Sequence, residues 1–101
     1  MTTNVVVSTT GVQDDIRVGR AGVQRIDGSN QLKVLVPIRN ISDHTVHIRV
    51  QTSFLNLEKQ PIGDDTNQQV QILSPGMTIN HVAVSKTDEA RDWVMRIGEN
   101  N

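Results

Sequence analysis

The sequence contains no cysteine in its 101 residues. This absence excludes a disulfide framework, a metal site built on thiolates and a cysteine nucleophile, and it leaves the compartment open. A chain of this length has room for one domain, which can bury a core without a metal or a disulfide. We therefore predict a single domain over residues 1–101, with residues 1–3 and 98–101 frayed.

Aromatic residues are scarce, because the sequence has one Trp, one Phe and no Tyr. With an apolar fraction of 36%, this composition predicts a thin core built mainly from Val, Ile and Leu. We expect a free energy of unfolding on the order of 5 kcal/mol. Trp93 alternates with Met95 and Ile97, so we expect the only Trp to lie in the core. Few rings then remain for stacking on sugars, which disfavours glycan recognition.

Neither sign of charge dominates, and no long apolar run is present. Ten basic residues nearly balance eleven acidic ones, so the chain lacks the positive field that draws proteins to nucleic acid. No stretch approaches the roughly 18 apolar residues of a membrane span, and the first residues lack the basic start and apolar run of a signal peptide. We expect a soluble chain, with a removed leader or lipid anchor as the open alternative.

Two neighbouring segments give the clearest structural signal. Residues 31–40 and 44–56 each alternate apolar and polar side chains with a period of two, which is typical of strands with one buried face. The short polar link at residues 41–43 joins them. We therefore predict a β-hairpin that covers the core.

Short β-prone runs separated by turn residues continue along the chain, a spacing that favours a sandwich or barrel. We predict an all-β, immunoglobulin-like β-sandwich of about seven short strands. They are expected at residues 4–8, 16–26, 31–40, 44–56, 69–73, 77–84 and 92–97. Ser74-Pro75-Gly76 predicts a type II turn, since Pro75 presets φ and Gly76 accepts a positive φ. Residues 86–91 combine hydroxyl caps, early acids and Ala, which predicts one short helical turn.

No constellation in the sequence specifies a reaction. His44 and His47 are three residues apart, on opposite faces of a strand, and His81 lies in another strand, so we predict no metal site. No serine stands in a nucleophile elbow. Asp64 and Asp65 lack the alternating oxygen ligands of a calcium loop and are better explained as a solvated turn. We expect neither an enzyme nor a cofactor.

Two sets of polar residues are candidates for binding a partner. The outer face of the predicted hairpin would carry Arg39, His47, Arg49 and Gln51. Arg17 and Arg20 lie in a segment where Gly19 and Gly22 weaken a strand and favour an edge. These arginines could meet an acidic partner, but charges and bulges also protect edges from unwanted pairing. Both interpretations stay open.

Four motifs carry a resemblance to a known family. They are VPIRNIS at 36–42, HIRVQTSFLN at 47–56, LSPG at 73–76 and ARDW at 90–93. Over residues 30–97 the chain resembles the YcfL family of small, largely uncharacterised bacterial envelope proteins, commonly predicted lipoproteins with an immunoglobulin-like sandwich. It is also similar to the FxLYD-type sandwich domains of bacterial surface proteins. The lipid-bearing cysteine expected of a mature lipoprotein is absent from these 101 residues.

The resemblance implies a non-enzymatic module of the bacterial cell envelope. We expect it to recognise a protein partner through a β-sheet face or edge, and to be periplasmic, tethered to the outer membrane only through a lipid anchor outside this sequence. A cytoplasmic location is the alternative. The competing functions are a glycan- or peptidoglycan-binding module, a homodimer that completes its sheet by self-association, and a hydrolase with a pocket around Ser or His.

Overall fold

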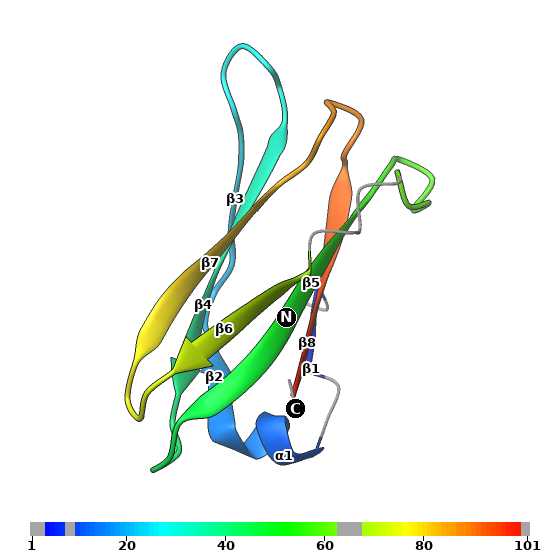
Figure 1. The fold of residues 1–101 in the computed structure, drawn as a ribbon. Helices are drawn as coiled ribbons and strands as arrows, with labels where there is room; N and C mark the ends of the chain where they lie inside the picture. Colours follow the sequence, from blue (N-terminus) through cyan, green and yellow to red (C-terminus); the bar gives the residue numbers. More distant parts are fainter. Residues whose placement is uncertain (1–3, 8–9, 63–67, 100–101) are drawn as a thin grey trace.

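A computed structural model describes residues 4–7, 10–62 and 68–99. Within these residues the chain forms eight strands and one helix (Figure 1). In chain order they are β1 (Val5–Val7), α1 (Thr10–Asp15), β2 (Ile16–Val18), β3 (Gly22–Arg25), β4 (Leu32–Asn40), β5 (Val46–Leu55), β6 (Gln69–Leu73), β7 (Thr78–Val84) and β8 (Asp92–Glu99). Regular structure is therefore almost entirely β.

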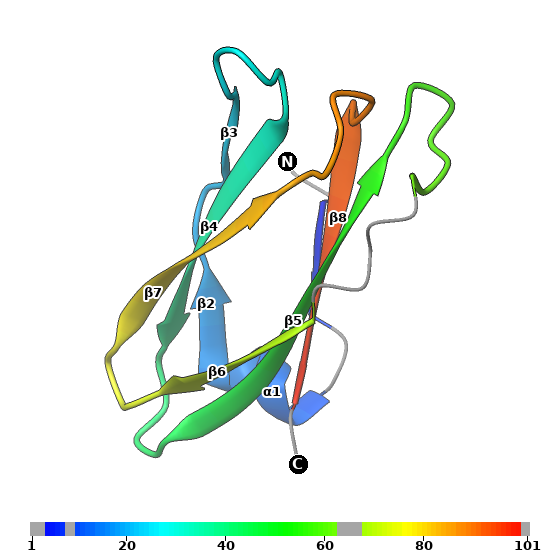
Figure 2. The ribbon, with the colours of Figure 1, turned by 45° about the horizontal axis from the view of Figure 1, so that its top comes forward.

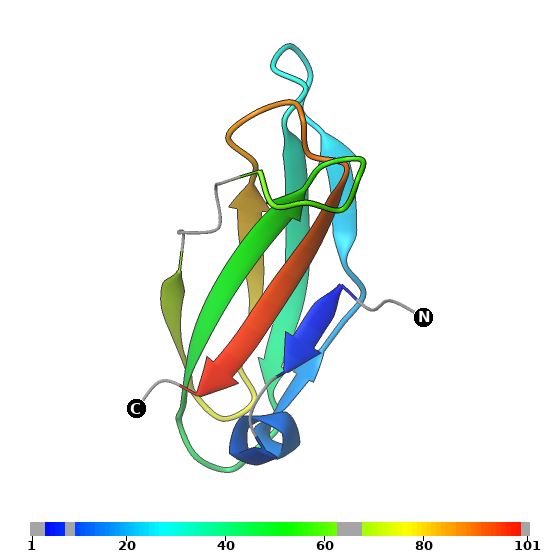
Figure 3. The same ribbon diagram turned by 90° about the vertical axis from the view of Figure 1, so that its right-hand side faces the viewer.

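The strands form two sheets that face each other. In the first, which we call the β5 sheet, the strand order is β1-β8-β5-β6. In the second, the β4 sheet, β4 pairs with β2 and β3 along one edge and with β7 along the other. Figure 3 shows the two layers, with β5 and β8 in front of β4 and β7. This arrangement confirms the predicted all-β sandwich.

The core lies between the inner faces of the two sheets. Alternating positions of β4 and β5 supply buried apolar side chains, namely Leu32, Val34, Val36, Ile38, Val46, Ile48, Val50 and Phe54. Trp93, Met95 and Ile97 of β8 join them, and Trp93 is only 5% exposed, so its predicted burial is confirmed. Val12 of α1 is also buried, and α1 lies across one end of the sandwich (Figure 1).

β4 and β5 belong to different sheets, so the predicted hairpin is wrong. The register partners of β4 lie on β2, β3 and β7, and those of β5 lie on β6 and β8. Residues 41–45 carry the chain from one sheet to the other. Period-two alternation fixes which face of a strand is buried but not which strand lies beside it. Two apolar faces can cover one core from opposite sides, and they do so here.

The predicted strand at 16–26 is broken into β2 and β3 where Pro37 lies in β4. A proline in a central strand cannot donate a hydrogen bond to one of its two neighbouring strands. It is tolerated here because, at the position of Pro37, β2 has ended and β3 has not begun. Gly19 lies beside Pro37 and donates its N–H to the Pro37 carbonyl at 2.9 Å. A Cβ on Gly19 would lie 2.9 Å from Cγ of Pro37, so the close approach requires glycine.

Two turns test the local predictions. The type II turn at Ser74-Pro75-Gly76 is confirmed, because Gly76 has φ of +78° and the Met77 N–H donates to the Ser74 carbonyl at 2.9 Å. The helical turn near 86–91 is wrong, since this segment is a bend and turn without helix. The Ser85 hydroxyl accepts from the Leu32 N–H and donates to the Thr87 carbonyl, at 2.9 and 2.7 Å. The Ser85 hydroxyl therefore holds the connection between β7 and β8 against the start of β4, and it does not cap a helix.

The chain ends and one loop complete the comparison with prediction. Gly98 and Glu99, expected to fray, are the last residues of β8. The single helix lies instead at α1, where none was predicted. Residues 1–3 and 100–101, and the turn around Asp64 and Asp65, fall outside the described residues.

Candidate functional site

The sandwich separates the residues predicted to share one outer face. Arg39 projects from β4 on the outside of the β4 sheet, whereas His47 and Arg49 project from β5 on the outside of the β5 sheet. Gln51 alternates with them on β5 and is half-buried. The predicted surface is therefore two surfaces on opposite sides of the molecule, a direct consequence of β4 and β5 not forming a hairpin.

The fold brings Arg39 to Arg17 instead. The two arginines are direct register partners in the antiparallel pair of β2 and β4, and both side chains are exposed. Directly opposed residues of such a pair project on the same face. Arg20 is exposed in the break between β2 and β3 and is not part of this pair. Arg39 from one predicted set and Arg17 from the other therefore lie together in a site that neither prediction contained.

An open hollow of about 340 Å³ lies beside this pair. Its walls are the two arginines with Asn40, Ile41, Ser42 and Gly76. Within the described residues, neither guanidinium takes part in an ion pair. The strands of the β4 sheet contain four basic residues, Arg17, Arg25, Lys33 and Arg39, and no Asp or Glu. Of these, Arg17 and Arg39 place positive charge at the mouth of the hollow.

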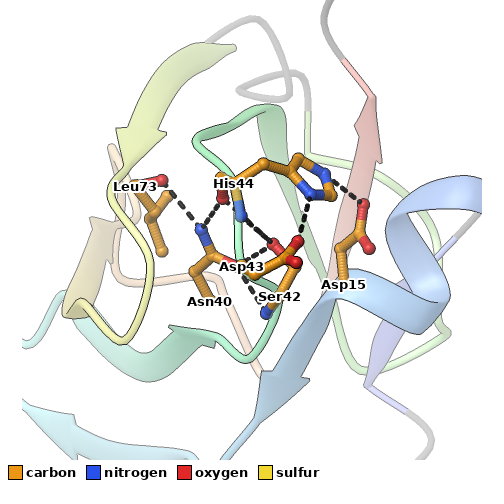
Figure 4. Close-up of polar contacts among 6 residues, drawn as sticks. All are labelled: Asp15, Asn40, Ser42, Asp43, His44 and Leu73. Atoms are coloured by element: carbon orange, nitrogen blue, oxygen red, sulfur yellow. Dashed lines mark hydrogen bonds and ion pairs between the residues drawn. The ribbon is translucent and has the colours of Figure 1, made fainter.

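Asn40 shapes the wall of this hollow (Figure 4). It is fully buried, and its side-chain amide donates to the carbonyls of His44 and Leu73 at 2.8 and 2.9 Å. Its Oδ1 accepts from the backbone N–H and the hydroxyl of Ser42, at 2.9 and 2.6 Å. One amide thus ties the end of β4 to the crossover and to β6, and it fixes the chain beside Arg39.

β7 continues the outer face of the β4 sheet towards its free edge. Its outward side chains change from polar to apolar along the strand, in the order Thr78, Asn80, Val82 and Val84. Thr78 is the register partner of Arg39, so the polar end of β7 lies next to the arginine pair. At the other end, Val82 and Val84 are 40% and 37% exposed. β7 itself is therefore polar beside the exposed Arg39 and apolar at its other end, where the half-buried Lys33 of β4 is the register partner of Val84.

The second edge of β7 has no partner strand among the described residues, since β7 pairs with β4 alone. Figure 2 shows β7 at the margin of its sheet, joined to β6 by a short turn. The Asn40 N–H donates to the Met77 carbonyl and the Ser85 N–H to the Leu32 carbonyl, each at 2.9 Å. Because bonding alternates in an antiparallel pair, the odd-numbered residues of β7 bond to β4. The even-numbered residues, Thr78 to Val84, turn their N–H and C=O groups to the open edge.

The outer face of the β5 sheet is different in charge. Arg49 donates to the Glu99 carbonyl and Arg96 to the Ser53 hydroxyl, each at 3.4 Å. The ammonium group of Lys59 bonds to the carboxylate of Asp92 and lowers the pKa of that carboxyl. The basic residues here have acceptors close by.

Histidines occupy two separate environments. His44 lies between two carboxylates, with Nε2 3.3 Å from Asp15 Oδ2 and Nδ1 3.4 Å from Asp43 Oδ1, and these contacts raise its pKa, Asp43 most (Figure 4). His81 is buried, which lowers its pKa, and its Nδ1 lies 3.4 Å from Nε2 of Gln71. In the described part of the chain, no three acidic, histidine or cysteine side chains are grouped to hold a metal.

Sequence reasoning missed the contribution of β7. Its sequence, TINHVAV, contains neither a charged residue nor a proline, the two commonest protections of an edge strand. The sequence shows this lack of charge and proline directly, but its significance depends on the topology, which places β7 at an edge of its sheet.

Comparison with known proteins supports the fold. The Campylobacter jejuni protein cj0090 has a similar structure, with a TM-score of 0.79 over 98% of this chain and 100% of that chain, at 12% identity. A DUF1425 family member from Shewanella sp. pv-4 matches with a TM-score of 0.75 over 85% of this chain and 79% of that chain, at 14% identity. No family model and no curated protein sequence matches the chain. Among the described residues no helix has the length and apolar character to cross a membrane.

Proposed function

We propose that this protein is a non-enzymatic interaction module of the bacterial cell envelope that binds an extended segment of a partner protein along β7. The observation that carries the proposal is the open edge of β7, which adjoins an outer face with basic residues and no acidic ones in its strands. Strand addition of this kind draws affinity from backbone hydrogen bonds and specificity from alternate side chains.

The edge has the length and chemistry that strand addition requires. β7 has seven residues, near or above the usual strand length, and lacks the lysines and prolines that blunt an exposed edge. The opposite margin of the same sheet is interrupted between β2 and β3, which protects it. One edge of the β4 sheet is thus broken while the other is continuous.

The proposed envelope location rests on the resemblance to the YcfL family, and the structural neighbours support the fold of such a protein. The motifs in residues 36–93 resemble the YcfL family, and the structural neighbours include a DUF1425 family member and a second bacterial protein. We propose a periplasmic domain, reaching the outer membrane only through a lipid anchor carried outside this sequence.

Glycan binding is the weaker candidate. The only two aromatic residues, Trp93 and Phe54, are 5% and 1% exposed. Neither ring can stack on a sugar without unfolding the core. A second copy of this chain is also a weaker occupant of β7, because its β4-sheet strands offer no acidic residue to the arginine pair.

A proline substitution tests the edge directly. The Asn80 N–H faces the open edge, so Asn80→Pro removes a donor for the partner while sparing the bonds from β7 to β4. Asn80→Ala is the matched control, since it changes the same side chain and keeps the N–H. Each variant, checked for native melting, would be used to capture proteins from bacterial envelope extracts.

We expect a partner that is retained by the wild type and Asn80→Ala and lost with Asn80→Pro. Hydrogen exchange of the complex should show new protection at the even-numbered amides of β7. Retention by Asn80→Pro, or no retained protein at all, would overturn the proposal. A wild-type dimer in sedimentation that Asn80→Pro abolishes would replace the partner by a second copy of the chain.

A further inference from the structure

The geometry points to the chemistry of the segment that β7 accepts: we infer an acidic side chain opposite Thr78 and apolar side chains opposite Val82 and Val84. This inference rests on the proposed strand addition and adds its specificity. In a sheet, side chains of paired residues lie side by side on one face. The outward face of β7 therefore dictates what each alternate position of an added strand meets.

The acidic position follows from the row of register partners at one end of the sheet. Arg17, Arg39 and Thr78 are successive partners across β2, β4 and β7. An added strand would place its next residue in this row beside Thr78, two strand spacings or about 10 Å from the backbone of Arg39. An extended arginine and an aspartate or glutamate span this distance together.

Charge makes this position selective. Like charges directly opposite each other in a sheet destabilise it, and Arg17 and Arg39 have no ion-pair partner among the described residues. A carboxylate from outside would relieve that repulsion and form charge-assisted hydrogen bonds with Arg39. A basic residue at the same position would add a third positive charge to the row.

The apolar positions follow from the other end of β7. Val82 pairs with the half-buried Leu35 and Val84 with Lys33, and both valines are exposed. Apolar residues opposite them would remove this surface from water. They would lie four and six positions from the acid, as Val82 and Val84 lie from Thr78. In an antiparallel segment the acid comes last, and in a parallel segment it comes first.

Selection from a random peptide library displayed on phage tests the pattern, with three immobilised proteins: the wild type, Arg39→Glu and Asn80→Pro. For the wild type we expect peptides with two apolar residues at alternate positions and one Asp or Glu. This acidic residue should lie four positions from the nearer apolar residue and six from the farther one. Arg39→Glu should keep the apolar positions and select Lys or Arg in place of the acid. Replacing the acid by Gln in a selected peptide should weaken wild-type binding about two- to fivefold.

The outcomes separate the two ideas. Apolar alternation without an acidic preference, or an acid that persists with Arg39→Glu, would overturn the inferred specificity and leave strand addition standing. Equal selection by Asn80→Pro and the wild type would overturn strand addition itself. The same selection on Arg49→Glu, which changes the β5 sheet, should return the wild-type pattern, and a reversed charge there would also contradict the assignment to Arg39.

Discussion

The two sheets are alike on their inner faces and different on their outer faces. Both inner faces supply fully buried aliphatic residues to one core. Outside, the β5 sheet carries Arg49 and Arg96 together with Asp92, whereas the strands of the β4 sheet carry Arg17, Lys33 and Arg39 and no acidic residue. The burial of apolar side chains on folding explains the composition of the inner faces. It does not explain Arg17 opposite Arg39, because like charges directly opposite each other destabilise a sheet.

The edges sharpen this contrast. β1, at one margin of the β5 sheet, has only three residues, and the broken margin of β2 and β3 is similarly poor as a template. β6, the other margin of the β5 sheet, is uncharged but has only five residues, whereas β7 is uncharged and has seven. A costly charge pair and a long, unprotected edge therefore occur on the same sheet, and the proposed binding site uses both.

The largest effect should come from the core that the sheets share. Phe54→Ala in the β5 sheet removes a ring that is 1% exposed, and we expect a loss of about 3–5 kcal/mol. Ile38→Ala in the β4 sheet should cost about 2–5 kcal/mol. Urea unfolding would be followed both by Trp93 fluorescence and by circular dichroism. If Ile38→Ala left the Trp93 transition unchanged, the sheets would unfold separately and the single shared core would be refuted.

The next effect concerns the crossover between the sheets. Asn40→Ala leaves the buried carbonyl of Leu73 and the N–H of Ser42 without their amide partner, and we expect it to lower the free energy of unfolding by about 2–3 kcal/mol. Ser42→Ala removes a hydroxyl at the rim and should cost no more than about 1 kcal/mol. Equal losses in urea unfolding would show that the Asn40 network does not hold the crossover.

The sequence predicted the strands better than their partners. All seven predicted strand positions contain strands, because the alternation of apolar side chains records the burial of each face. The pairing of β4 with β7 joins residues that lie 39 positions apart at Arg39 and Thr78 and 51 apart at Lys33 and Val84, and no local pattern encodes it. The break at Gly19 is hinted at by glycine, but its reason, the contact with Pro37, is also nonlocal.

The candidate site shows the same limit. Each of Arg17 and Arg39 was recognisable as an exposed basic residue on a strand, yet they were assigned to different surfaces. Their meeting depends on the register of β2 with β4, which a one-residue slip would abolish. Asn40 was missed because a buried amide that bridges three backbone segments has no sequence signature.

A smaller and opposite pair of effects should appear with pH. Burial lowers the pKa of His81 on β7, so its contribution to stability is complete above the ordinary pKa of 6.5 and is lost as the pH falls through the folded pKa. Asp43 and Asp15 raise the pKa of His44, so its contribution is complete below 6.5 and is lost as the pH rises through the folded pKa.

Urea midpoints measured between about pH 7.5 and about pH 5 would separate these two histidines. His81→Gln should reduce the loss of stability on acidification, and His44→Gln should increase it, relative to the wild type. Parallel pH profiles for the wild type and His81→Gln would contradict the burial of a neutral imidazole in the β4 sheet.

The smallest effect bears most directly on the contrast between the outer faces. Arg39→Glu places a carboxylate opposite Arg17 and should raise the free energy of unfolding by about 0.2–1 kcal/mol. Arg49→Glu is the matched control on the β5 sheet, where the wild-type guanidinium already bonds to the Glu99 carbonyl, and no gain is expected. Precise thermal melts at low salt would resolve the difference, since salt screens such pairs. If neither variant is more stable than the wild type, the arginine pair carries no cost, and binding is not needed to explain its presence. A variant that is more stable but no longer selects acidic segments would show that this face gives up stability for recognition.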